Sequence, residues 1–75
     1  MYHTIQFTAD LLIDVEISPK KRLERVLIRK GDRLWAQLKP YVVETAEGPV
    51  EVADLFFADG TTARSVPFAH FAFVG

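Results

Sequence analysis

The chain has 75 residues, of which 49% are hydrophobic and 25% charged, and its formal net charge is −1. This length fits one domain covering residues 1–75, and the composition is that of a folded globular chain, which excludes a disordered one. The absence of cysteine excludes disulfides and thiolate metal sites, and no apolar run is long enough to cross a bilayer. Because the first residues lack the pattern of a signal peptide, we expect a cytoplasmic protein with no membrane partner.

Apolar and polar residues alternate from Ile5 to Ile17, with Leu12 as the single exception. Alternation with a period of two places the apolar side chains on one face of a β-strand. Thirteen residues are long for one strand, so we expect either one bent strand or two strands that meet near Ala9 and Asp10.

The next segment, from Ser18 to Lys30, allows two interpretations. Ser18 can cap a helix, Pro19 can take the first helical position, and Gly31 can end the helix. Alternatively, Val26 and Ile28 alternate with residues 25, 27 and 29 as in a strand, and residues 30–32 form a turn. The pattern leaves open whether residues 19–30 contain one short helix or belong to a hairpin.

From residue 33 onward, the chain has the features of short β-strands joined by turns. Pro40 interrupts the first extended segment and marks a sheet edge or a bulge, because proline donates no backbone hydrogen bond. Residues 46–49 form a turn cluster, and Asp59-Gly60 is the strongest hairpin signal in the chain. The expected strands after these turns cover residues 50–58, 61–66 and 71–74.

Two segments resemble those of the Src-homology-3-like (SH3-like) barrels. Residues 26–34 (Val-Leu-Ile-Arg-Lys-Gly-Asp-Arg-Leu) are similar to the diverging turn of that family, where an apolar pair precedes Lys-Gly-Asp or Lys-Gly-Glu. Residues 58–61 and 65–71 are similar to its distal hairpin, short 3₁₀ turn and final strand. The resemblance implies an all-β fold, a small five-stranded SH3-like barrel in which residues 8–25 are a long first loop that is itself a hairpin.

The peptide-binding residues of that family are mostly absent from this chain. The position of the family's binding tryptophan falls near Val52, and His70 stands where the family has a tyrosine. Only Pro67 matches a residue of the family's ligand groove, and the first loop is basic near its tip where the family's is acidic. We therefore do not expect a proline-rich ligand.

An aromatic strand surface is the first candidate for binding. Trp35 lies between Leu34 and Ala36, so its side chain points outward if these two face the core, and we expect it near Phe56. A large exposed aromatic side chain is typical of an interface anchor. The expected partner is another protein or a second copy of this chain, and the candidate interface residues are Trp35, Phe56, Tyr41, Pro67 and His70.

Basic residues are concentrated in one segment. Seven of the nine lie within residues 20–33, where two acids leave a net charge of +5 (7 − 2), whereas the rest carries −6 (2 − 8). Such a cluster is suited to nucleic-acid phosphates or an acidic protein, although it is also typical of a solvated face. The candidate residues for this alternative function are Lys20, Lys21, Arg22, Arg25 and Arg29.

No pattern of catalytic or cofactor-binding residues is recognisable. The only histidines are His3 and His70, the glycines are isolated, and Asp14 and Glu16 have the spacing of one solvated strand face. We therefore expect a non-enzymatic interaction module with no catalytic residue, metal site or cofactor.

Overall fold

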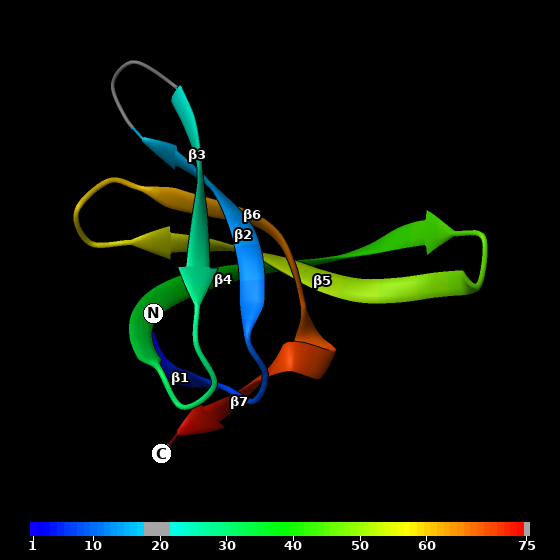
Figure 1. The fold of residues 1–75 in the computed structure, drawn as a ribbon, viewed down its shortest axis with the longest axis horizontal. Helices are drawn as coiled ribbons and strands as arrows, with labels where there is room; N and C mark the ends of the chain where they lie inside the picture. The colour runs from blue at the N-terminus through cyan, green and yellow to red at the C-terminus, as the bar shows by residue number, and fades with distance from the viewer. Residues whose placement is uncertain (18–21, 75) are drawn as a thin grey trace.

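A computed structural model describes residues 1–17 and 22–74 and shows one curled antiparallel sheet. The sheet forms a half-barrel, with the strand order β3-β2-β6-β5-β4-β1-β7 (Figure 1). The described part of the chain contains no α-helix. The strands are β1 (His3–Phe7), β2 (Leu11–Ile17), β3 (Arg22–Ile28), β4 (Arg33–Thr45), β5 (Gly48–Phe57), β6 (Thr62–Pro67) and β7 (Phe71–Val74), and a 3₁₀ helix, η1 (Phe68–His70), precedes β7.

The long alternation near the start of the chain forms two strands, β1 and β2, which confirms the second of the two interpretations. The chain turns at residues 8–10, where Asp10 Oδ1 accepts the backbone N–H of Lys30 at 2.8 Å. Ile5 and Phe7 of β1 are fully buried, and Ile13 of β2 is 5% exposed. The alternating apolar positions therefore face the interior of the half-barrel, as the pattern predicted.

The segment before Gly31 is a strand, so the helical alternative is wrong for residues 22–28. β3 pairs with β2 along its whole length, with Val26 opposite Ile13 and Ile28 opposite Leu11. These pairs bury Ile28 in the core, which a helix could achieve only by giving up the cross-strand hydrogen bonds. The predicted helix cap and hairpin tip, at residues 18–20, lie outside the described residues.

The all-β prediction is confirmed, but the expected number of five strands is wrong, because the sheet has seven. The two additional strands are β2 and β3, the hairpin that the family resemblance counted as a loop. β2 is joined to β6 through Val15 opposite Ala63 and Glu16 opposite Thr62, so this hairpin is a continuous part of the sheet.

The β4–β5 hairpin extends beyond its neighbouring strands and forms a projecting arm, residues 40–51 (Figure 1). β1 pairs with β4 only at residues 33–36, and β6 pairs with β5 only at residues 52–56. β4 therefore continues through Pro40, where it has β5 on one side only, and Pro49 is in the same situation on β5. A strand that is paired on one side only tolerates proline. Pro40 therefore lies at a sheet edge, as expected, but it does not interrupt β4.

The core fills the concave side of the curled sheet. Its residues come from every strand, so the half-barrel has one continuous apolar interior. The buried members are Ile5, Phe7, Ile13, Ile28, Ala36, Ala53, Leu55, Ala63, Val66 and Phe71. On β1, β4 and β7, the residues that alternate with these buried positions point to the convex side of the sheet, where they form an outer face.

Candidate functional site

The outer face of β4, β1 and β7 is the candidate site. Strand register places Trp35 opposite Thr4, and Thr4 opposite Val74, in one row across the three strands. The next row consists of Arg33, Gln6 and Ala72. We call the surface formed by these two rows, together with Tyr2 and Lys30, the outer face.

An aromatic stack lies at one end of the outer face. Trp35 is 58% exposed, and its ring stacks on that of Tyr2 with 4.4 Å between ring centroids and an interplanar angle of 28°. Residue 2 has the same parity as Thr4 and Gln6, so extending the alternation backward would have placed Tyr2 on this face. The stack fixes the orientation of the indole while leaving more than half of it open to a partner.

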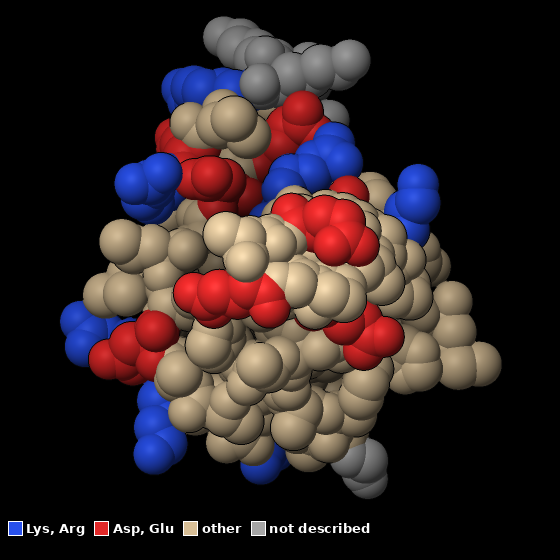
Figure 2. Space-filling view, turned by 90° about the vertical axis from the view of Figure 1, so that its right-hand side faces the viewer, with Lys and Arg blue, Asp and Glu red and all other residues tan. Residues whose placement is uncertain are grey.

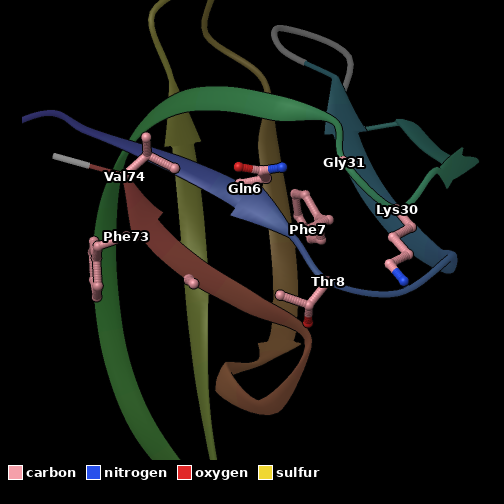
Figure 3. A pocket seen from close by; sticks show the side chains of 8 residues that line it. Gln6, Phe7, Thr8, Lys30, Gly31, Phe73 and Val74 are labelled. Carbon is pink, nitrogen blue, oxygen red and sulfur yellow. The ribbon is translucent and has the colours of Figure 1, made fainter.

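A hollow lies along the other part of the outer face. It has a volume of about 580 Å³ and is lined by Gln6, Phe7, Thr8, Lys30, Gly31, Ala72, Phe73 and Val74. Figure 3 shows Lys30 at one end of the hollow and the side chains of Phe73 and Val74 at the other. The turn that carries Lys30 is held against β1, because Gly31 N–H donates to Phe7 O at 2.8 Å and Phe7 N–H to Asp32 O at 2.9 Å.

The structure does not bring the five predicted interface residues together. Tyr41 lies six residues from Trp35 along β4, which corresponds to about 20 Å of extended strand. Phe56 lies opposite Gln37, two residues from Trp35, and is partly buried. Pro67 lies in the same row as Tyr41 but two strands away, with Val52 of β5 between them, and the carbonyl of His70 in η1 accepts the Thr8 N–H.

Tyr41 belongs to a polar network around Asp54, which is 7% exposed. Asp54 Oδ1 accepts hydrogen bonds from Tyr41 Oη at 2.8 Å and from Ser65 N at 2.9 Å, and Oδ2 accepts one from Arg64 at 3.1 Å. Arg64 also donates to Glu16 at 2.7 Å, which links the β2–β3 hairpin to β6. The network therefore connects β4, β5, β6 and β2 on the convex side of the sheet.

The network surrounds a β-bulge. Ala53 pairs with Val66 and Leu55 with Ala63, so Arg64 and Ser65 together oppose the single residue Asp54. Ser65 has a φ of +54°, a conformation that is costly for residues other than glycine, asparagine and aspartate. The Asp54 carboxylate accepts the N–H of Ser65 at the bulge, so we interpret this network as structural.

Burial alone raises the pKa of Asp54, but the hydrogen bonds from Ser65, Tyr41 and Arg64 outweigh it and hold that pKa below the ordinary value of 3.8. The pKa of Arg64 is raised by its hydrogen bonds to Glu16 and Asp54. Asp54 and Arg64 are therefore both charged at neutral pH, as a structural ion pair requires.

The predicted basic cluster is partly neutralised by the protein's own acids. Arg22 pairs with Glu24 at 2.8 Å, and Arg25 with Asp14 at 3.4 Å. Arg29 is exposed, and Lys20 and Lys21 lie outside the described residues. Within the ranges 1–17 and 22–74, no group of three or more histidines and carboxylates is placed to hold a metal ion. No helix in these ranges is long and apolar enough to cross a membrane.

Comparison of the chain with protein-family models, with curated proteins and with solved structures found no match.

Proposed function

We propose that this chain is a non-enzymatic interaction module that associates with other proteins through the outer face, with a second copy of itself as the first partner to test. The observation that carries the proposal is the Tyr2–Trp35 stack. A tryptophan that is 58% exposed adds little to the core, whereas a rigid, half-open aromatic pair can anchor an interface.

The surroundings of the stack support a protein partner. The hollow on the same outer face is bordered by the short strand β7, which pairs on one side only and carries neither charge nor proline. Such a surface offers apolar area together with the polar side chains of Thr4 and Gln6, the mixture found at interfaces between proteins. An SH3-like barrel also remains part of the proposal, supported by the hairpin at Asp59-Gly60 and the 3₁₀ helix η1 before the last strand.

The alternative, nucleic-acid binding through residues 20–33, has less support. Two of the three described arginines in the predicted set are engaged by carboxylates, which reduces the charge available for phosphates. The cytoplasmic location expected from the sequence remains a prediction.

The test is the molar mass of the protein by light scattering over a range of micromolar concentrations. We expect a mass above 8.5 kDa that rises with concentration, together with a blue shift of the Trp35 fluorescence as the indole is covered. Trp35→Ala should lower the mass, whereas Leu12→Ala, at a leucine that is 59% exposed on the β2–β3 hairpin, should not. A monomer at every concentration, or equal effects of the two variants, would overturn the proposal.

A further inference from the structure

Two groups of charges without an ion-pair partner among the described residues lie at opposite ends of β4, and Lys39, also exposed and unpaired there, lies between them. Arg29, Lys30 and Arg33 are exposed at its beginning, and none of them forms an ion pair with a carboxylate of the described residues. Two carboxylates face the same turn, but each accepts a backbone N–H there: Asp32 that of Arg29 at 3.0 Å, and Asp10 that of Lys30 at 2.8 Å. The beginning of β4 is therefore a cationic end with one positive charge in excess (3 − 2).

The arm at the other end of β4 is acidic. Glu44, Glu47 and Glu51 are exposed, and no ion pair within the described ranges involves them. The sequence contains no lysine or arginine from residue 40 to residue 63. Figure 2, which looks at the side on which the arm projects, shows acidic residues over the centre of the view, with basic residues directly above them and to either side. The arm thus carries three negative charges, and the nearest basic residue along β4 is Lys39 at its base.

The arm also has the shape and the apolar surface of a docking element. Its tip is a tight turn of Ala46 and Glu47, closed by hydrogen bonds from Thr45 Oγ1 to Gly48 O at 2.7 Å and from Glu47 N to Thr45 Oγ1 at 3.2 Å. Val42, on one strand of the arm, is 59% exposed. A two-stranded ribbon is only marginally stable by itself in water, so contact with another surface would stabilise it.

We propose that the occupant of the outer face is the acidic arm of a second copy of this chain. Glu44 and Glu47 of one copy lie against Lys30 and Arg33 of the next, the tip enters the hollow beside Lys30, and Val42 supplies apolar contact near the Tyr2–Trp35 stack. This inference rests on the proposed function and specifies its partner. The argument for the second copy is charge complementarity between two surfaces that the same chain carries.

The arrangement is head to tail. The arm and the outer face are different surfaces, placed at opposite ends of β4, so one contact leaves a free arm on one copy and a free outer face on the other. When further copies occupy these free surfaces, the contacts are heterologous and build rings or open chains, whereas reciprocal exchange of arms about a two-fold axis stops at a dimer.

The first experiment compares association of the full chain at low and high salt. Raising the NaCl concentration from about 50 mM to about 500 mM shortens the range of charge interactions, so we expect the dissociation constant to rise by about tenfold or more. The charge-removing variants Glu44→Gln/Glu47→Gln and Lys30→Gln/Arg33→Gln should each weaken association to a similar extent. Arg25→Gln, which removes an exposed cation from the β2–β3 hairpin, is the matched control and should leave association unchanged.

The decisive experiment mixes the two double variants. The arm of the Lys30→Gln/Arg33→Gln chain is intact, and so is the outer face of the Glu44→Gln/Glu47→Gln chain, so an equimolar mixture should contain a 1:1 heterodimer and nothing larger. Each variant alone should be monomeric at the same concentration. A mixture that remains monomeric, while the wild type associates, refutes the head-to-tail contact.

The outcomes separate this inference from the proposed function. If Trp35→Ala abolishes association and the charge variants do not, the arm is not the occupant, although the outer face remains an interface. If the charge variants abolish association and Trp35→Ala does not, the arm contact stands and the aromatic anchor is wrong. Both ideas fail if the wild type is monomeric throughout, or if the outer face instead binds a labelled oligonucleotide that Lys30→Gln/Arg33→Gln releases.

Discussion

Replacement of Asp54 by asparagine tests whether its carboxylate holds the bulge in β6. Asparagine keeps the size of the side chain and an oxygen that can accept from Tyr41 and Ser65, but it removes the charge and the ion pair with Arg64. The two remaining hydrogen bonds each lose about 0.5–1 kcal/mol when the acceptor becomes neutral. The half-exposed pair with Arg64 is screened by solvent and adds little, so the free energy of unfolding should fall by up to about 2 kcal/mol.

The assay is urea unfolding at neutral pH, followed by far-UV circular dichroism, together with a thermal scan. For a chain of this size, a loss of about 2 kcal/mol corresponds to a decrease of about 8–16 °C in Tm. Glu51→Gln, an exposed acid on the same strand with no ion pair among the described residues, is the control and should change stability by less than about 0.5 kcal/mol. If Asp54→Asn is as mild as this control, the bulge does not depend on the carboxylate and the reasoning is refuted.

Acidification should destabilise the protein in part through Asp54. Because the pKa of Asp54 is lower in the folded than in the unfolded state, its contribution to the free energy of unfolding is present above about pH 4 and is lost as the pH falls through the folded pKa. The free energy of unfolding of Asp54→Asn, measured against pH, should lack this contribution. Leu55→Ala, at a side chain with 0% exposure, should cost about 2–5 kcal/mol in denaturant unfolding, and a loss below about 1 kcal/mol would contradict the assigned core. Gly60→Ala, at a φ of +90°, should cost about 1 kcal/mol by the same measurement, and an unchanged midpoint would be evidence against this turn geometry.

Strands with a strict alternation were predictable, because their faces are set by local pattern alone. Ile5, Phe7 and Ile13 were correctly placed inward, and Asp59-Gly60 marked the hairpin. The strand at residues 22–28 was not decided, since its periodicity fits a helix almost as well as a strand. What decides it is the pairing of Val26 with Ile13, a contact between distant residues that no local pattern contains.

The candidate site was only partly predictable. Trp35 was expected to be exposed from its neighbours, and it is, but Tyr2 was missed although its parity places it on the same face. The role of Tyr41 could not be foreseen, because the bulge that brings Ser65 to Asp54 has no sequence signal: a serine, and not a glycine, adopts the positive φ. Pairing of Arg25 with Asp14 likewise depends on strand register, and pairing of Arg22 with Glu24 depends on residues 22–28 being a strand; the charge count gives neither.

The prolines of the arm have a consequence for how the protein behaves at high concentration. Pro40 and Pro49 lie on the two strands of the arm at positions where each strand has a neighbour on one side only. Because proline has no backbone N–H, an added strand cannot form a regular ladder of backbone hydrogen bonds along either edge of the arm. The prolines therefore disfavour the edge-to-edge pairing that leads to fibrils. The arm can therefore project into solvent without pairing with other strands, and a partner recognises it through its turn and its side chains. An unprotected strand edge would instead pair with any extended peptide, so the prolines keep binding to the arm selective.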